Sequence, residues 1–299
     1  MSEQTAYLAP EGFLDDLLAE LGPSVGEVHG RLVLTHRPEQ PVAWAANVWR
    51  MPMRVPIASI GDAAKKLRAV QRNWSLYPHA HQRRAALIAE RLPRVSAKPL
   101  DFGAPAPSAP LGSWTLLSHE EMLISPTCSS AFPNGEISFV EDRVSSPSRA
   151  YLKLWEALTL IGVRPGPGDL CLDLGASPGG WTWVIANLGA RVISIDKAPL
   201  DPGIAAMEGV DVRRESAFGL QPGTLPPVDW LFSDVICYPA RLLSLIERWI
   251  ASGRARRFVC TVKFQGETDF LAIERFKAIP GSRLLHLHHN KHELTWIKL

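Results

Sequence analysis

The amino-acid sequence predicts a protein of the α/β class, with a doubly wound parallel sheet that closes in an antiparallel C-terminal hairpin. Three observations support this prediction. From residue 146 onward, apolar strand-like runs alternate with helical patterns, which is typical of a parallel sheet covered on both faces. A glycine-rich turn separates the first of these strands from its helix. The last two strand-like runs follow each other without a helix between them, which indicates an antiparallel pair.

The elements of residues 146–299 can be assigned in order. Serines and an early proline before RAYLKLWEALTLI are typical of a helix start, and GVRPGPGD ends that helix. Strand DLCLDLG, helix GGWTWVIANLG and strand RVISID follow, then a loop that could hold a short helix, and then strands VDVRRES and DWLFSDV. Helix PARLLSLIERWIAS, strand RRFVCTVKF, helix TDFLAIERFKAI and the strands SRLLHLHHN and ELTWIKL complete the region.

Residues 1–145 are expected to form a smaller α+β domain. GFLDDLLAEL has helical spacing, VGEVHGRLVLTH alternates as a strand does, and residues 62–72 and 80–92 have helical patterns. The proline-rich stretch 104–112 predicts a linker, because proline at alternate positions excludes helix and central strand. SWTLLSHEEMLISPT predicts two further short strands.

Composition is that of an ordinary globular protein. The chain has 299 residues, 46% hydrophobic and 21% charged, with a formal net charge of +2. No apolar run approaches the roughly 18–20 residues that span a bilayer, and the acidic N-terminus lacks the pattern of a signal peptide. We therefore expect a cytoplasmic protein. Its cysteines lack CxxC spacing and are expected to be reduced thiols: Cys128, Cys171, Cys237 and Cys260.

Positive charge is concentrated in residues 40–100, which hold eleven lysines and arginines against two acids. Such clustering suits a phosphate backbone. Trp44, Trp49, Trp74 and Tyr77 are interleaved with these cations and could stack on bases. A solvated helical surface over an aromatic core is the alternative interpretation.

The turn DLGASPGGW at residues 173–181 indicates a nucleoside site. Its glycines allow a tight turn and close approach of a ligand to a helix N-terminus. Asp196 ends the next strand, where an acid suits the two hydroxyls of a ribose. The turn lacks G-x-G-x-x-G, and Pro178 removes a backbone donor that a pyrophosphate would use. These features favour S-adenosylmethionine and disfavour a nicotinamide dehydrogenase.

DLGASPGGW resembles the cofactor motif of the FtsJ-type ribose 2′-O-methyltransferases, and SRAYLKLWE at residues 148–156 resembles the helix before it. The resemblance covers residues 146–299 in order, with a weaker one at PEGFLDDLLAEL. It implies a Rossmann-like sheet, S-adenosyl-L-methionine as cofactor, no metal and a monomer. It also implies that the N-terminal domain recruits RNA.

The resemblance further implies a Lys-Asp-Lys-Glu tetrad, which falls by position on Lys153, Asp234, Lys263 and Glu293. Asp234 and Lys263 follow apolar strands, at the edge where doubly wound sheets bind ligands. We expect Lys263 to accept the proton of a ribose 2′-hydroxyl and Lys153 to orient the ribose or phosphate. The two acids would position Lys263.

The expected cofactor-binding residues are Asp173, Gly175, Ser177, Gly179, Gly180, Trp181, Asp196, Ser216 and Asp234. Ser216 departs from the family pattern, which has an aspartate there for the adenine amino group. Ser216 or a backbone carbonyl would have to supply this contact. His286 and His288 in HLHHN fall on one face of an expected strand but lack acidic or cysteine partners, so we expect surface or RNA contacts.

The resemblance implies a favoured substrate, a cytidine ribose of large-subunit (23S) ribosomal RNA, free or in a pre-ribosomal particle. Two alternatives stay open at this point. One is the same chemistry on another RNA, such as a messenger cap or a transfer RNA. The other is a non-catalytic RNA-binding assembly module that keeps the fold, and cofactor binding would distinguish this module from an enzyme.

Overall fold

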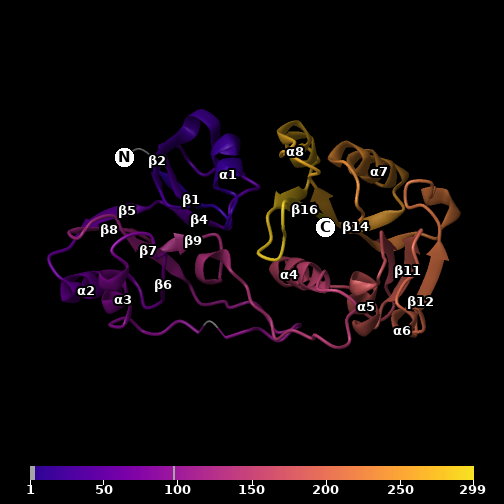
Figure 1. The fold of residues 1–299 in the computed structure, drawn as a ribbon, viewed down its shortest axis with the longest axis horizontal. Helices are drawn as coiled ribbons and strands as arrows, with labels where there is room; N and C mark the ends of the chain where they lie inside the picture. Colours follow the sequence, from indigo (N-terminus) through magenta and orange to yellow (C-terminus); the bar gives the residue numbers. More distant parts are fainter. Residues whose placement is uncertain (1–3, 97) are drawn as a thin grey trace. The chain divides into compact units, whose positions relative to one another are not determined.

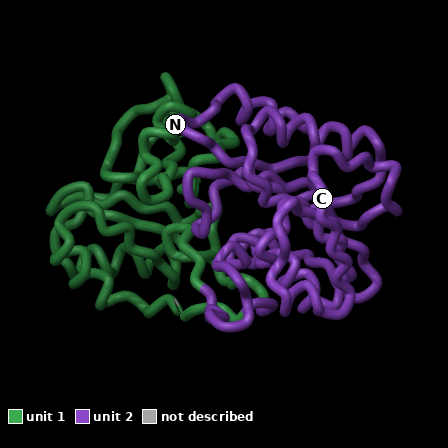
Figure 2. Tube along the Cα trace, turned by 45° about the vertical axis from the view of Figure 1, so that its right-hand side comes forward, with its two compact units in different colours: residues 1–101, 105–138 green, residues 102–104, 139–299 purple. Residues whose placement is uncertain are grey.

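The computed structural model describes residues 4–96 and 98–299. The chain divides into two compact units, one of residues 1–101 and 105–138 and one of residues 102–104 and 139–299 (Figure 2). The short piece Phe102–Ala104 belongs to the second unit, where the ring of Phe102 stacks on Trp155 with centroids 4.7 Å apart. The chain leaves the first unit after residue 138 and stays in the second from residue 139. This point lies a few residues before the expected domain boundary at 145–146.

The second unit is built on a seven-stranded sheet of order β12-β11-β10-β13-β14-β16-β15 (Figure 1). The parallel strands are β10 (Leu170–Leu174), β11 (Arg191–Asp196), β12 (Val210–Arg214), β13 (Val228–Ser233) and β14 (Ala255–Lys263). β16 (Glu293–Lys298) runs antiparallel between β14 and β15 (Ser282–Leu285). The predicted fold class, a parallel sheet closed by an antiparallel C-terminal hairpin, is confirmed.

Helices cover both faces of this sheet. Figure 1 shows α4 (Tyr151–Ile161), α5 (Gly180–Asn187) and α6 (Pro202–Ala205) on one face, with α7 (Pro239–Ser252) and α8 (Phe270–Lys277) on the other. In α7, Leu242, Leu245, Ile246 and Trp249 are buried at helical spacing. A short 3₁₀ turn, η3 (Pro222–Thr224), precedes β13.

The start of α4 differs from the prediction that serines cap it. Ala150 is the N-cap residue and no side chain caps the helix. The hydroxyl of Ser146 instead donates to the carbonyl of Ser148 at 2.9 Å. This hydroxyl is therefore used in a local turn and not to cap the helix. The first two turns of α4 are buried throughout, including its charged residues Lys153 and Glu156.

The described residues of the first unit form two sheets and three helices. One sheet has the order β2-β3-β1-β4-β9 and the other β5-β8-β7-β6. The strands are β1 (Thr5–Leu8), β2 (Val25–His29), β3 (Leu32–Thr35), β4 (Asn47–Arg50), β5 (Met53–Pro56), β6 (Trp74–Leu76), β7 (Gly112–Leu116), β8 (Glu121–Ser125) and β9 (Thr127–Cys128). The helices are α1 (Leu14–Leu21), α2 (Ile60–Val70) and α3 (Gln82–Ala89), with 3₁₀ turns η1 (Gly22–Ser24) and η2 (Pro133–Gly135).

The prediction of a single strand in VGEVHGRLVLTH is wrong. The chain reverses after His29 and forms the antiparallel pair β2–β3, with Gly30 at a φ of +61°. The left-handed backbone at this position favours glycine, which makes the reversal possible.

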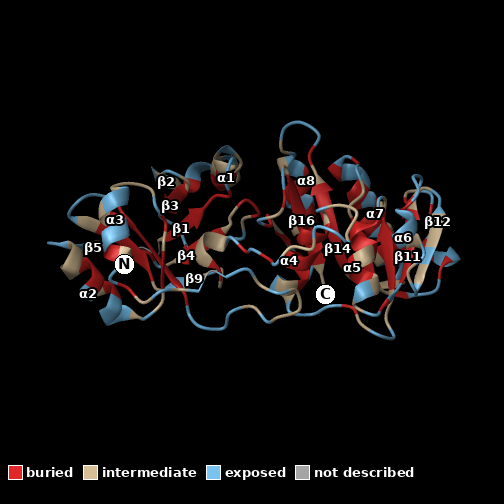
Figure 3. Cartoon of the chain, turned by 60° about the horizontal axis from the view of Figure 1, so that its bottom comes forward, coloured by how far each residue is buried: buried red, intermediate tan, exposed pale blue. Residues whose placement is uncertain are grey.

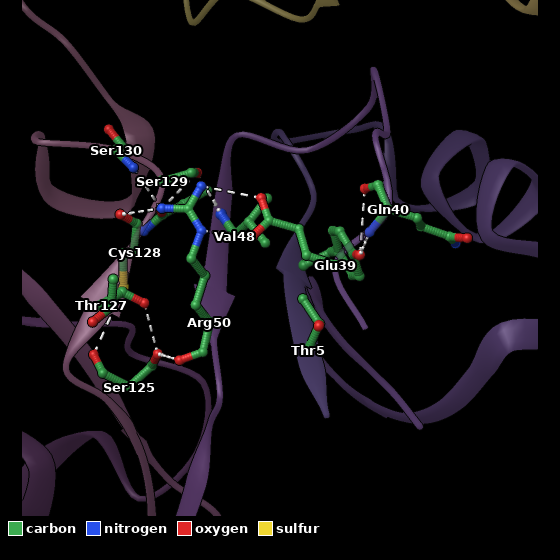
Figure 4. Close-up of polar contacts among 12 residues, drawn as sticks. Thr5, Glu39, Gln40, Val48, Arg50, Ser125, Thr127, Cys128, Ser129 and Ser130 are labelled. Atoms are coloured by element: carbon green, nitrogen blue, oxygen red, sulfur yellow. Dashed lines mark hydrogen bonds and ion pairs between the residues drawn. The ribbon is translucent and has the colours of Figure 1, made fainter. Parts of the chain in front are cut away.

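Arg50 at the end of β4 joins this strand to two other segments of the first unit (Figure 4). Its guanidinium donates to both carboxylate oxygens of Glu39, at 2.6 and 3.1 Å, and to the carbonyl of Cys128 at 3.4 Å. The last contact lies in β9, whose pairing with β4 places it at the edge of the sheet.

The aromatic residues of the basic segment are core residues. Trp44, Trp49, Trp74 and Tyr77 are at most 5% exposed, so they cannot stack on bases, and that interpretation is wrong. In Figure 3 the strands are largely buried while much of the surface of α2 and α3 is exposed. Exposed cations on these helices and just after them include Lys65, Arg68, Arg72, Arg83 and Arg91.

All four cysteines are free, and three of them are buried. Among residues 4–96 and 98–299, none of the helices combines the length and the apolar character that crossing a membrane requires.

Candidate active site

Four charged side chains meet at the edge of the sheet where β13 and β14 end. Lys153 lies in α4, Asp234 follows β13, Lys263 ends β14 and Glu293 begins β16. The sheet register explains part of this arrangement, because Lys263 and Glu293 are directly opposed in the antiparallel β14–β16 pair. The structure thus brings together the four residues that were expected to form a tetrad.

Asp234 is the centre of this group. Its carboxylate oxygens accept hydrogen bonds from the ammonium of Lys153 at 2.8 and 2.9 Å. The ammonium of Lys263 lies 3.1 Å from Asp234 Oδ1 and donates to the Asp234 carbonyl at 2.7 Å. Lys153 Nζ also lies 3.1 Å from Glu293 Oε1. Two cations and two anions therefore offset one another where an unpaired buried charge would be costly.

The two lysines differ in how tightly they are held. Lys153 contacts the carboxylates of both Asp234 and Glu293, and its side chain is 10% exposed. Lys263 contacts one carboxylate and one carbonyl, and its side chain is 18% exposed. Lys263 is therefore the more accessible amine and the better placed to meet a molecule arriving from solvent.

The glycine turn after β10 packs directly against the chain that follows Asp234. Gly175 has a φ of +79°, and a Cβ added there would lie 2.6 Å from Val235 Cα and 2.9 Å from its nitrogen. The amide of Asp234 also donates to the carbonyl of Leu174 at 3.2 Å. Glycine is thus required at position 175 for both conformational and steric reasons, and the turn fixes the backbone beside Asp234.

A cleft of about 220 Å³ opens beside this turn. Of the residues expected to bind a cofactor, Gly175, Asp196 and Ser216 line it, and Val235 and Ile236 form the wall next to Asp234. The carboxylate of Asp196 accepts hydrogen bonds from the amides of Ser177 at 3.0 Å and Ala198 at 2.9 Å. These two bonds fix the orientation of the carboxylate at the end of β11.

A cation and an aromatic ring lie together in the same cleft. The Arg241 guanidinium is 3.8 Å from the ring centre of Phe218, and both residues line the cleft. This contact is a cation–π interaction, which holds the loop after β12 against the start of α7.

Asp173 lies beneath the turn. It is 1% exposed, and its Oδ2 accepts a hydrogen bond from the hydroxyl of Thr182 at 2.7 Å. Burial raises the pKa of Asp173 to about 7, and the charges of Asp234 and Asp196 act in the same direction. Within the part of the chain that the structure describes, Asp173 Oδ1 is buried and has no hydrogen-bond partner.

The other expected cofactor residues serve the turn and its helix. Trp181 is buried, and its indole N–H donates to the carbonyl of Ala150 at 2.9 Å, so its side chain packs α5 against the start of α4. The Ser177 hydroxyl donates to the carbonyl of Pro199 at 2.8 Å. Gly179 is the N-cap residue of α5, and a Cβ on Gly180 would lie 2.6 Å from Ser148 Oγ.

Sequence reasoning missed Glu156, which lies one helical turn after Lys153 in α4. Its carboxylate accepts from the amides of His288 at 2.7 Å and His289 at 3.0 Å, and from His289 Nδ1 at 2.6 Å. The only signal in the sequence was an acid three residues after a lysine within an otherwise apolar helix. Its partners are far away in the sequence and could not be inferred.

The histidine segment was expected to continue a strand and to lie on the surface. The first expectation is wrong, and the second is wrong for His286 but holds for His288, which is exposed. β15 ends at Leu285, and His286 is buried and donates to the carbonyl of Lys291 at 3.0 Å. Burial lowers the pKa of His286 to about 4. In the described ranges, His, Cys, Asp and Glu form no group of three or more that could hold a metal ion.

The family that matches this chain matches it within the second unit. Residues 147–251 match the FtsJ-like methyltransferase family. A ribosomal RNA large subunit methyltransferase M from Aromatoleum aromaticum is 35% identical over 164 residues, which are 50% of this chain and 44% of that protein. The protein of the same name from Halorhodospira halophila is 37% identical over 160 residues, 50% of this chain and 46% of that protein.

This chain therefore spans about half the length of the curated relatives it matches. Among solved structures, a 1,6-didemethyltoxoflavin-N1-methyltransferase from Burkholderia thailandensis is 18% identical with a TM-score of 0.36. That alignment covers 50% of this chain and 77% of the other.

Proposed function

Because residues 147–251 form an FtsJ-like methyltransferase domain, we propose that this chain methylates a ribose 2′-hydroxyl of RNA with S-adenosylmethionine. The observation that carries the proposal is the sharing of Asp234 between the ammonium groups of Lys153 and Lys263, beside a cleft suited to a nucleoside. Relatives named ribosomal RNA large subunit methyltransferase M support large-subunit ribosomal RNA as the substrate. We further propose that the target is a cytidine of the 23S RNA, as the resemblance of the sequence implies.

The residues around the cleft fit S-adenosylmethionine. Asp196 is oriented to accept from the ribose hydroxyls, and Ser216 lines the same cleft for the adenine end. The missing side chain at Gly175 lets the turn pack against Val235 in the wall of the cleft, and the buried Asp173 Oδ1 has no hydrogen-bond donor among the described residues. When bound, this cofactor supplies an electrophilic methyl group.

In the proposed mechanism, Lys263 in its amine form takes the proton from the 2′-hydroxyl as the oxygen attacks. Lys263 has fewer carboxylate partners than Lys153 and is more exposed, which supports Lys263 and not Lys153 as the proton acceptor. Lys153, held between Asp234 and Glu293, would fix the carboxylate that orients Lys263 and supply positive charge next to the developing alkoxide. Holding the hydroxyl in place lowers the entropic part of the barrier.

The first unit would recruit RNA through its exposed cations. Lys65, Arg68, Arg72, Arg83 and Arg91 are exposed on α2, on α3 or close to their ends. Contacts to phosphates provide affinity without reading sequence, and they weaken as salt rises. The buried aromatic residues beneath them support the fold of this unit and not base stacking.

The test is to map 2′-O-methyl groups in ribosomal RNA from cells with and without this protein, together with calorimetric titration of the purified chain with S-adenosylmethionine. We expect one methyl group that depends on the protein and on Lys263. An unchanged map would remove the ribosomal substrate. Failure to bind the cofactor would remove the enzymatic function and favour an RNA-binding assembly module.

A further inference from the structure

The segment 286–292 between β15 and β16, called here the 286–292 turn, is fixed by its own hydrogen bonds. His286 donates from its ring to the carbonyl of Lys291 at 3.0 Å, and the amide of Asn290 donates to the carbonyl of Leu287 at 3.0 Å. The buried side chain of Asn290 also donates to the hydroxyl of Thr295 at 3.1 Å. The turn therefore has a defined shape although it contains neither helix nor strand.

A buried carboxylate anchors this turn to α4. Glu156 is 2% exposed and accepts three hydrogen bonds from the turn, two from the amides of His288 and His289 and one from the ring of His289. Bonds to a charged acceptor are stronger than those between neutral groups. Because Lys153 lies one helical turn before Glu156, the same helix holds both the turn and a lysine of the tetrad.

The turn also contacts the reaction centre directly. The amide of Lys291 lies 3.5 Å from Glu293 Oε1, the oxygen that lies 3.1 Å from Lys153 Nζ. The amide of Glu293 donates in return to the carbonyl of Lys291 at 2.8 Å. The backbone position of Lys291 is therefore coupled to that of the tetrad glutamate.

The side chain of Lys291 is not used by these contacts. Lys291 is exposed, and its ammonium has no acidic partner within residues 4–96 and 98–299. A fixed backbone thus holds an unneutralised cation next to a site whose proposed substrate is a polyanion. Phosphate contacts of this kind set the register of a strand on the protein surface.

We propose that the 286–292 turn is a preformed phosphate-binding element, in which Lys291 takes a phosphate of the RNA strand close to the target nucleotide. The inference rests on the proposed function, because it requires RNA as substrate. Glu156 is then a positioning residue: it keeps the turn in the conformation that presents Lys291, so that little ordering is left to occur when RNA binds.

The experiment measures binding of the full chain to a mixed-sequence single-stranded RNA oligonucleotide by fluorescence anisotropy, between about 50 and 200 mM salt. For K291Q, we expect the slope of log affinity against log salt to become shallower by about 0.7, the value for one phosphate contact on a single strand. K291R keeps the charge and should keep the wild-type slope. R191Q is the matched control, because Arg191 is exposed at the opposite end of the sheet strands, where β11 begins.

E156Q tests the positioning of Lys291 separately from its charge. It keeps the charge of Lys291 but loosens the turn, so the salt slope should stay that of wild type while the cost of ordering the turn lowers RNA affinity by several-fold. A wild-type slope in K291Q would overturn the phosphate contact, and wild-type affinity in E156Q would overturn the positioning role. If the wild-type chain binds no RNA, the proposed function fails as well, and this outcome is distinct from wild-type binding that is indifferent to Lys291.

Discussion

Lys263 and Glu293 face each other across the β14–β16 pair, and each makes an ionic contact with a residue outside that pair. Lys263 contacts Asp234 after β13, and Glu293 contacts Lys153 in α4. The sheet register sets the distance between two members of the charged group, and the two other members set their orientation. A change at any one of the four positions therefore alters the surroundings of the rest.

Lys263→Ala is expected to slow methyl transfer by about 100-fold or more, because a proton acceptor in the transition state contributes about this much. Cofactor affinity should stay at the wild-type value, since Lys263 does not line the cleft that holds Asp196 and Ser216. Single-turnover transfer at saturating cofactor measures the first quantity, and calorimetry measures the second. Lys298→Ala, at the far end of β16, is the control, and a wild-type rate for Lys263→Ala would contradict the assignment.

Gly175→Ala is expected to lower both the stability of the protein and its affinity for S-adenosylmethionine. The new methyl group would meet the backbone of Val235, and the φ of +79° is unfavourable for alanine, so a cost of about 1–3 kcal/mol follows. Chemical unfolding and calorimetric titration measure the two effects. Gly223→Ala provides the comparison because a Cβ added at Gly223 would have nothing within 4 Å of it, and equal behaviour of the two variants would refute the steric argument.

Asp173→Asn should flatten the pH dependence of the unfolding free energy. The pKa of Asp173 is raised by burial from 3.8 to about 7, so over that interval the folded protein keeps a proton that the unfolded chain has released. The contribution of Asp173 to stability therefore falls as pH rises, by about 4 kcal/mol in total. Urea unfolding of the cofactor-free protein between about pH 5 and 8 tests this, and parallel profiles for wild type and variant would disprove it.

Ser216→Asp should bind S-adenosylmethionine about tenfold more tightly, because a charged acceptor for the adenine amino group makes a stronger hydrogen bond than a hydroxyl. Ser216→Ala should bind it more weakly, since Ser216 lines the cleft and its hydroxyl would be lost. Calorimetry on the two variants should therefore show changes in cofactor affinity of opposite sign. Wild-type affinity in both would place the adenine contact on another group.

Much of the second unit was predictable because its sequence follows simple periods. Strand and helix patterns alternate at spacings that only a parallel sheet accommodates, and the final pair had no room for a crossover. The four residues of the charged group were predicted together because a family resemblance implied their order. Their contacts, such as the sharing of Asp234 between two lysines, required coordinates.

The errors arose where different structures share one local pattern. Alternating apolar and polar residues are found both in one long strand and in a hairpin of two short strands, so the pattern did not predict the reversal at Gly30. Aromatic residues among cations fit a stacking surface or a core equally well, and only packing places Trp49 and Trp74 in the core. The role of Glu156 depends on partners more than a hundred residues away, which no local signal carries.

The placement of β16 has a consequence for how the charged group assembles during folding. This strand lies inside the sheet, between β14 and β15, and it carries Glu293, whereas Lys153 comes from the helix that precedes β10. The charged group therefore joins the earliest and the latest elements of the seven-stranded sheet unit. A chain whose sheet is still open has no complete site, and such non-local pairing forms slowly. The return of the proposed activity during refolding should thus report the insertion of one strand and not the average recovery of structure.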